Sequence, residues 1–131
     1  MKSIINSNIF IVDDNPFWIK MQTQMLKDLG FTRIMTFNNG NDCVDNLDLN
    51  PAIIFLDYHM EGINGLQVLQ QIKSYYSGIN VVFCTNNEDL EVAVDAIKYG
   101  SQEYLLKENA SKKELTHIIE SILQRNVSGS N

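Results

Sequence analysis

The sequence predicts an α/β fold in which helices cover both faces of a parallel β-sheet. Short apolar runs alternate five times with segments whose apolar residues recur at helical spacing, as in strand–helix–strand units. The strand-like runs are continuously apolar rather than alternating, which is typical of strands buried on both faces. A chain of 131 residues has the length of one domain with its own core.

The first strand is expected at residues 9–12, and the first helix begins after it at Asn15. Asparagine is a favoured N-cap residue, Pro16 suits the first helical position, and Gly30 supplies the C-terminal stop. The helical residues that we expect to face the sheet are Trp18, Met21, Met25 and Leu29.

The later elements are assigned by the same patterns. Strands are expected at 31–37, 51–56, 81–84 and 104–106, and helices at 39–47, after Gly65, at 89–99 and after Ser111. Ser111 and Glu114 form a capping-box pattern for the last helix. We expect one domain at 1–125 and a frayed tail at 126–131, which is rich in Ser, Gly and Asn.

The composition argues against several classes of function. The formal net charge is −6, and Lys and Arg form no stripe, which disfavours partners such as nucleic acid or an anionic membrane. No apolar run approaches the ~20 residues that span a bilayer, and the N-terminus holds no signal peptide. Cys43 and Cys84 are expected to be reduced thiols, so we predict a cytoplasmic protein.

Polar and charged residues stand where four of the apolar runs end. Asp13 and Asp14 follow the first run, Asp57 the third, Thr85 the fourth and Lys107 the fifth. The carboxyl ends of parallel strands meet at one edge of the sheet, where α/β proteins bind their ligands. We therefore expect carboxylates, a hydroxyl and an ammonium to share one site.

The acidic residues of this site require a cation. Two carboxylates about 4 Å apart repel by roughly 4 kcal/mol at an effective dielectric near 20, and oxygen ligands favour Mg²⁺. Alternatively, Asp13 and Asp14 cap the first helix and Asp57 is a solvated loop residue, but the three strand-end positions together favour the metal site. Asp57 is the candidate nucleophile, because a carboxylate can accept a phosphoryl group as an acyl phosphate. Lys107 and Thr85 would then stabilise the phosphoryl oxygens.

These motifs in combination resemble those of response-regulator receiver domains, the CheY-like modules of two-component signalling. The resemblance covers about residues 7–125. It implies a flavodoxin-like three-layer sandwich, with a five-stranded parallel sheet in the order 2-1-3-4-5 and five helices. By the same resemblance, Asp57 is the phosphoacceptor, Thr85 the switch hydroxyl, Tyr104 the switch aromatic and Lys107 the phosphate-pairing lysine. The implied Mg²⁺ ligands are Asp14, Asp13 directly or through water, Asp57, and the backbone carbonyl of His59.

The resemblance also implies a function and partners. A receiver takes a phosphoryl group from a histidine kinase or a histidine phosphotransfer protein and signals to a downstream protein by a conformational switch. Such a domain is not an enzyme for other substrates, since it promotes only its own phosphorylation and dephosphorylation. The face of the fourth helix, fifth strand and fifth helix is a candidate dimer surface. Phe17 and Ile19 lie off the apolar stripe of the first helix, so they either anchor the phosphodonor or pack on neighbouring loops.

Two positions depart from the family pattern. Asn86 stands where the family usually has Ala or Gly, and Glu108 follows Lys107 where the family usually has Pro. Because a cis bond before a residue other than proline costs about 3 kcal/mol, a trans Lys107–Glu108 bond and a different aim of Lys107 are expected. These departures support one alternative, a pseudo-receiver that acts as an interaction module without phosphorylation.

Two other classes fit poorly. A phosphatase resembling the haloacid dehalogenases carries a second Asp two residues after its nucleophile, where this chain has His59. A flavodoxin cradles a phosphate in its first loop, where Asp13 and Asp14 would repel it. The side chains of His59 and His117 are expected to be ordinary surface histidines.

Overall fold

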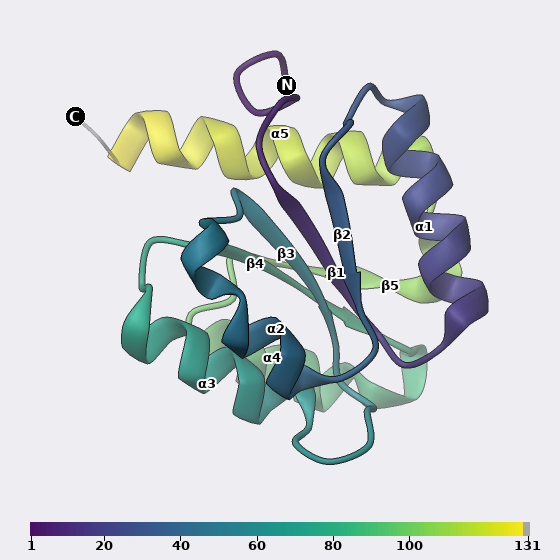
Figure 1. Ribbon diagram of the computed structural model, residues 1–131, viewed down its shortest axis with the longest axis vertical. Helices are drawn as coiled ribbons and strands as arrows, with labels where there is room; N and C mark the ends of the chain where they lie inside the picture. The colour runs from purple at the N-terminus through teal and green to yellow at the C-terminus, as the bar shows by residue number, and fades with distance from the viewer. Residues whose placement is uncertain (130–131) are drawn as a thin grey trace.

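A parallel β-sheet forms the middle layer of a three-layer sandwich (Figure 1). The structure is a computed structural model that describes residues 1–129. Its strands are β1 (Ile9–Val12), β2 (Ile34–Phe37), β3 (Ile53–Asp57), β4 (Asn80–Thr85) and β5 (Glu103–Leu106). They pair in parallel in the order β2-β1-β3-β4-β5. The predicted fold class and strand order are confirmed.

Helices cover both faces of the sheet (Figure 1). The helices are α1 (Pro16–Asp28), α2 (Gly40–Asp45), α3 (Gly65–Tyr75), α4 (Leu90–Lys98) and α5 (Lys112–Gly129). Helices α1 and α5 pack together on one face, while α2, α3 and α4 line the other. None of the helices within residues 1–129 is both long and apolar enough to cross a membrane.

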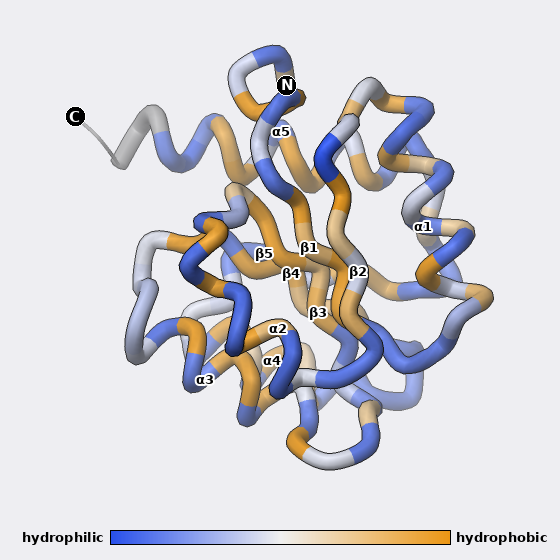
Figure 2. Tube along the Cα trace, in the orientation of Figure 1, coloured by the Kyte–Doolittle hydropathy of each residue, from blue (hydrophilic) through white to orange (hydrophobic). Residues whose placement is uncertain are grey.

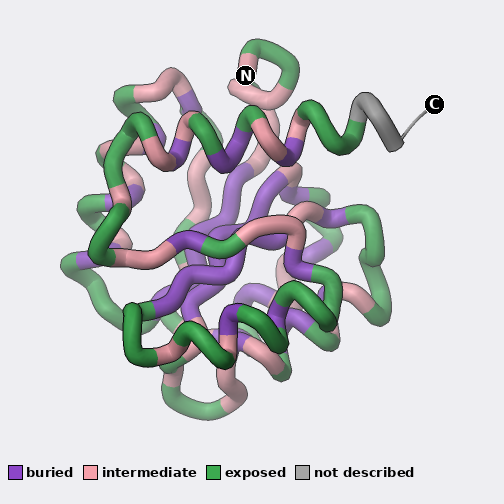
Figure 3. The backbone as a smooth tube through the Cα atoms, turned by 180° about the vertical axis from the view of Figure 1, so that it is seen from behind, coloured by how far each residue is buried: buried purple, intermediate pink, exposed green. Residues whose placement is uncertain are grey.

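The three central strands, β1, β3 and β4, are buried on both faces, as their continuous apolar sequences predict, whereas the edge strands β2 and β5 are partly exposed. Ile11 and Phe55 point into the cluster under α1 and α5, whereas Phe10 and Ile54 point into the cluster under α2, α3 and α4. The hydrophobic strands stand out at the centre of Figure 2, and Figure 3 shows the same segments as the buried part of the chain. Two apolar layers therefore fix the sheet and its strand ends in place.

Helix α1 begins as predicted but is rotated relative to the expected stripe. The Asn15 side chain accepts hydrogen bonds from the backbone N–H groups of Phe17 and Trp18, with Pro16 as the first helical residue. The buried positions are Trp18, Gln22 and Leu26. Met25 and Leu29 lie at the border of this stripe, and Met21 is exposed, so the prediction for Met21 was wrong. The stripe shifts because a buried glutamine takes the place that an apolar residue was expected to fill.

Several element boundaries differ from the predicted ones by a few residues, and short 3-10 turns adjoin some of the elements. One turn, Leu47–Leu49, follows α2, and a second, Asn87–Asp89, precedes α4. A third, Lys107–Asn109, follows β5. Strand β2 begins at residue 34, and β3 begins two residues after Pro51. The Ser111 hydroxyl accepts the Glu114 N–H at 3.0 Å, which is half of the predicted capping box.

The sequence predicts a frayed tail at residues 126–131. Helix α5 runs to Gly129, so its backbone continues past residue 125. Residues 130 and 131 lie outside the described residues. The fraying of 126–131 stays a prediction.

Candidate functional site

The ends of β1 and β3 bring three aspartates together. These strands are neighbours, with Val12 paired to Leu56, so Asp13 and Asp57 leave the sheet side by side. One carboxylate oxygen from each of Asp13, Asp14 and Asp57 lies within 4.8 Å of the other two. Asp13 and Asp57 are 1% and 5% exposed, whereas Asp14 faces solvent. The cluster is therefore closed on the sheet side and open at Asp14.

Lys107 reaches this cluster from the end of β5, two strands away from β3. Its Nζ lies 2.6 Å from Asp13 Oδ2 and 2.9 Å from Asp57 Oδ1. The Lys107–Glu108 peptide bond is trans, as expected for a bond without proline. With this trans bond, the Lys107 ammonium still lies between the buried carboxylates of Asp13 and Asp57.

Thr85, the last residue of β4, lies between the other two strand ends in the sheet. Its backbone neighbours are Leu106 of β5 and, through Cys84, Asp57 of β3. The Thr85 side chain is buried, and its Oγ1 has no hydrogen-bond partner among the described residues. A buried hydroxyl without a partner is unusual, because it has lost water without replacing it. The Thr85 hydroxyl is thus a buried donor that no described residue pairs with.

The electrostatics of the cluster favour added positive charge. Burial, and then the neighbouring Asp13, raise the pKa of Asp57 to about 6, although Lys107 opposes the shift. Burial alone would lower the pKa of Lys107, but its hydrogen bond to Asp13 and its attraction to Asp57 outweigh this effect and raise the pKa. Three carboxylates face one ammonium, so the site has a surplus of negative charge and of oxygen donors. Such a site suits a hard divalent cation such as Mg²⁺.

The open side of the cluster carries further polar residues that the strand-end argument missed. Asp14 lines a surface hollow of about 410 Å³ together with Asn38, Asn39 and Glu61. Asn38 directly follows β2, which is the neighbour of β1. The rule that picked out the other strand ends could therefore have found Asn38, whereas Glu61 lies in a loop without such a signal.

A glycine lets the backbone of Asp57 come close to α3. A Cβ atom on Gly65 would lie 2.3 Å from the Asp57 carbonyl oxygen and 2.8 Å from the Tyr58 Cα. The Gly65 N–H also donates to the Tyr58 carbonyl at 2.9 Å. The start of α3 is thus packed against the backbone that carries Asp57, a relationship that the sequence pattern did not reveal.

The remaining predicted residues lie around this pocket or at its periphery. The His59 side chain is largely exposed, and its Nε2 lies 2.9 Å from Asp89 Oδ2. Tyr104, on β5, has 44% of its surface exposed and thus stands outward. The metal-binding role of the His59 carbonyl and the switching role of Tyr104 stay predictions. Asn86 is exposed and lies in the segment between β4 and the turn that precedes α4.

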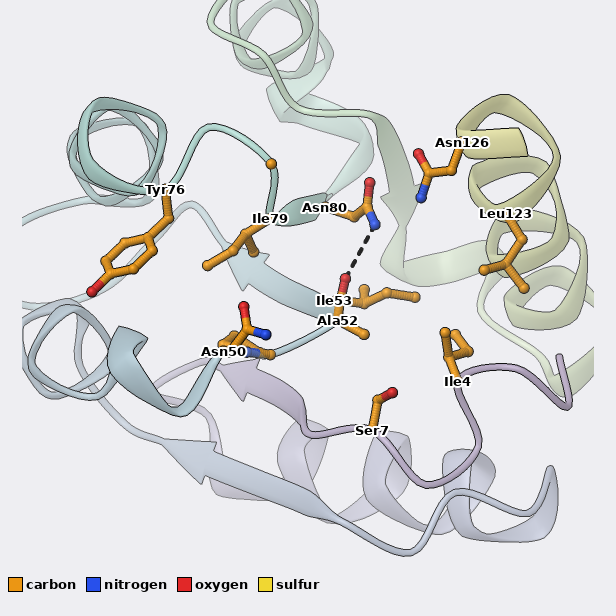
Figure 4. A pocket seen from close by; sticks show the side chains of 12 residues that line it. Ile4, Ser7, Asn50, Ala52, Ile53, Tyr76, Ile79, Asn80, Leu123 and Asn126 are labelled. Carbon is orange, nitrogen blue, oxygen red and sulfur yellow. Dashed lines mark hydrogen bonds between the residues drawn. The ribbon is translucent and has the colours of Figure 1, made fainter. Parts of the chain in front are cut away.

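The opposite end of the sheet holds a second hollow of about 490 Å³ (Figure 4). Ile4, Ile79 and Leu123 converge on it, and Asn80 donates to the Ala52 carbonyl at its floor, at 3.2 Å. The residues that line it carry no formal charge. The charged and potentially reactive groups therefore lie at the acidic cluster and not in this second hollow.

Comparison with known proteins places the chain in a family. A family model for the response regulator receiver domain matches residues 9–120. The chain belongs to the response-regulator receiver family. This agrees with the resemblance carried by its strand-end residues.

Individual relatives give the same picture. The chemotaxis protein CheY of Listeria monocytogenes is 32% identical over 100 residues, which are 76% of this chain and 84% of that protein. The DNA-binding transcriptional regulator NtrC of Salmonella typhimurium is 33% identical over 100 residues, which are 76% of this chain but 21% of NtrC. The solved receiver domain of NtrX from Brucella abortus superimposes with a TM-score of 0.81 at 25% identity, covering 88% of this chain and 98% of that one.

Proposed function

We propose that this receiver takes a phosphoryl group onto Asp57 from a phosphohistidine on a histidine kinase or a histidine phosphotransfer protein. The observation that carries the proposal is the position of Asp57, a buried carboxylate 2.9 Å from the Lys107 ammonium within the cluster of three aspartates. This arrangement supports phosphorylation over the pseudo-receiver alternative, because the departures at Asn86 and Glu108 leave the acidic cluster and Lys107 together. The family assignment and the relationship to CheY point the same way.

The transfer requires one bond to form as another breaks. A carboxylate oxygen of Asp57 attacks the phosphorus, and the N–P bond of the phosphohistidine breaks. The electron pair of that bond returns to the ring nitrogen, and because the other ring nitrogen carries a proton, the histidine leaves as neutral imidazole. Lys107 pairs with a phosphoryl oxygen, and the Thr85 hydroxyl donates to another. When bound by Asp13, Asp14, Asp57 and the His59 carbonyl, Mg²⁺ supplies positive charge for the phosphoryl oxygens. The chain acts on no further substrate in this proposal and promotes only its own phosphorylation and dephosphorylation.

The signal would travel from Thr85 to Tyr104. A phosphoryl group adds about 1.5 to 2 negative charges near neutral pH, and the Thr85 hydroxyl lacks a competing hydrogen bond among the described residues. Movement of Thr85 toward the phosphate would vacate space that the outward Tyr104 fills by rotating inward. The two conformations must differ by only a few kcal/mol for this to happen.

The surface that changes would be the face of α4, β5 and α5. Large apolar side chains are exposed on α4 and β5: Leu90, Val94, Ile97 and Tyr104. Single exposed apolar residues are ordinary, but a cluster on one face is typical of a protein interface. We propose that this face binds the downstream protein or a second copy of the chain.

The phosphodonor would dock beside the acidic cluster, on the first turns of α1. Phe17 is 74% exposed, and with Met21 and Met25 it lines a shallow hollow of about 430 Å³. Ile19 instead packs against the core under α1 and α5. Phe17 thus fits the anchoring role, and Ile19 does not.

Intact-mass spectrometry during incubation with acetyl phosphate and Mg²⁺ tests the proposal directly. We expect one added phosphoryl group in the unmodified protein, none in Asp57→Asn, and none when a chelator removes Mg²⁺. An unmodified protein that stays at its original mass, and whose spectra do not respond to beryllofluoride, would establish the pseudo-receiver alternative instead.

A further inference from the structure

The lysine of the acidic cluster lies against an aromatic ring. Trp18, in the first turn of α1, places its ring centroid 5.1 Å from Lys107 Nζ, within the distance at which an aromatic face attracts a cation. The Trp18 side chain is 6% exposed, so little water weakens this attraction. Lys107 therefore contacts the indole of Trp18 in addition to the carboxylates of Asp13 and Asp57.

The indole is itself held by Gln22, one helical turn further along α1. Trp18 Nε1–H donates to Gln22 Oε1 at 2.9 Å. Gln22 is fully buried, and its Nε2 has no hydrogen-bond partner among the described residues. Burying an amide with an unpaired N–H costs stability, and an apolar side chain would fill the same place without that cost. The hydrogen bond that Gln22 does make fixes the orientation of the indole.

We propose that Trp18, oriented by Gln22, is a positioning residue that holds the Lys107 ammonium over the Asp57 pocket. This inference rests on the proposed function. A lysine ammonium is a compact charge on a flexible stem, and an incoming phosphoryl group competes with Asp13 and Asp57 for it. The indole face of Trp18 takes no part in this competition and lies on a packed helix. It therefore contacts the ammonium both while Lys107 pairs with Asp13 and Asp57 and after Lys107 pairs with the phosphoryl group. Lys107 is thereby kept where it meets the phosphoryl oxygens during transfer.

The rate of phosphorylation by acetyl phosphate with Mg²⁺, followed by intact mass on the full chain, tests the proposal. Trp18→Leu removes the aromatic face and is expected to lower the rate at saturating acetyl phosphate about tenfold. Trp18→Phe keeps an aromatic face and is expected to stay within about threefold of the unmodified protein. Phe31→Leu is the matched control, because Phe31 is buried in the same apolar cluster, whereas the cation–π contact of Lys107 found among the described residues is with Trp18; this change should leave the rate unchanged.

The single tryptophan offers an independent readout that does not depend on the reaction. Lys107→Met keeps the length of the side chain and removes its charge, so the emission maximum of Trp18 should shift. Lys112→Met, at an exposed lysine paired with Asp28, should leave the emission unchanged. An identical emission spectrum in Lys107→Met would overturn the proposed contact.

The kinetic outcomes separate this inference from the proposed function. Equal rates in Trp18→Leu and Phe31→Leu, or equally slow rates in Trp18→Phe and Trp18→Leu, would overturn the positioning role alone. An unmodified protein that accepts no phosphoryl group would overturn the proposed function, and the positioning role with it.

Discussion

Gly65 stands so close to Asp57 that a methyl group on Gly65 would lie 2.3 Å from the Asp57 carbonyl oxygen. The atoms that would clash belong to the backbone of Asp57 and Tyr58, which cannot rotate away as a side-chain tip can. The start of α3 and the phosphoacceptor are therefore mechanically linked.

Gly65→Ala should destabilise the protein by about 2 kcal/mol, the usual scale for overpacking a close contact. It should also lower beryllofluoride binding, because relief of the clash moves the Asp57 backbone. Urea denaturation and a beryllofluoride titration measure the two effects. Gly78→Ala is the control, since a Cβ there would meet nothing within 4 Å. A Gly65→Ala protein as stable as Gly78→Ala would contradict the prediction.

Asp57→Asn should stabilise the fold in Mg²⁺-free buffer at neutral pH. The pKa of Asp57 is raised from 3.8 to about 6 by burial and then by Asp13, so the ionised carboxylate costs the folded state free energy above pH 6. A shift of this size corresponds to at most about 3 kcal/mol. The cost disappears as the pH falls from 6 toward 4, because folded Asp57 becomes protonated first. We therefore expect Asp57→Asn to be more stable by about 2 kcal/mol at pH 7.5 and equal to the unmodified protein near pH 4.

Urea denaturation at the two pH values measures this difference. Asp48→Asn serves as the control, because Asp48 is exposed and lies in the turn after α2. It should change the stability little at either pH. If Asp57→Asn proved less stable than the unmodified protein at pH 7.5, the repulsion inferred for the acidic cluster would be wrong.

Protons and Mg²⁺ should compete for the same carboxylate. Because a ligand must be deprotonated to bind a metal, the affinity for Mg²⁺ should be nearly constant above pH 7. Below the Asp57 pKa of about 6, it should weaken by about tenfold per pH unit. Calorimetric titrations at pH 5 and pH 7.5 check this. The same affinity at both pH values would show that Asp57 is not a ligand.

The strand-end residues could be predicted because a parallel sheet brings the carboxyl ends of its strands to one edge. That single geometric rule pointed to Asp13, Asp57, Thr85 and Lys107 without knowledge of any contact. The packing around them could not be derived in this way. Gln22 is polar yet fully buried, so hydrophobic periodicity assigned its place to Met21.

The fold itself followed from local patterns, and its errors have local causes. Short 3-10 turns such as Asn87–Asp89 have no clear periodic signal, so the sequence pattern did not predict them. The partner of Gly65 is set by how α3 meets β3 in space. A glycine in a predicted loop indicates conformational freedom, but the sequence does not show which backbone segment packs against that glycine.

Thr85→Val should have opposite effects on the unmodified and the activated protein. Thr85 Oγ1 is buried without a hydrogen bond among the described residues, so replacing it with a methyl group of similar shape should stabilise the resting fold by about 1 kcal/mol. The same change removes a donor to the phosphoryl group, so beryllofluoride should bind about tenfold more weakly. Urea denaturation and a beryllofluoride titration follow the two effects.

Thr23→Val is a matched control for this experiment. Thr23 Oγ1, on α1, is likewise buried and unpaired among the described residues. Its replacement should leave beryllofluoride binding unchanged. Equal beryllofluoride affinities for Thr85→Val and the unmodified protein would remove the Thr85 hydroxyl from the proposed switch.

Phe17→Ala should slow transfer from a phosphohistidine protein but not from acetyl phosphate. Phe17 is 74% exposed and contributes to the hollow on α1, so its ring can serve a protein donor without touching Asp57. Loss of an aromatic anchor from an interface should slow transfer by about tenfold at subsaturating donor. Tyr75→Ala removes an equally exposed aromatic ring, 75% exposed, from the end of α3 and should slow neither reaction. A Phe17→Ala protein slowed equally with both donors would show that the ring supports the chemistry of the pocket rather than the docking of its donor.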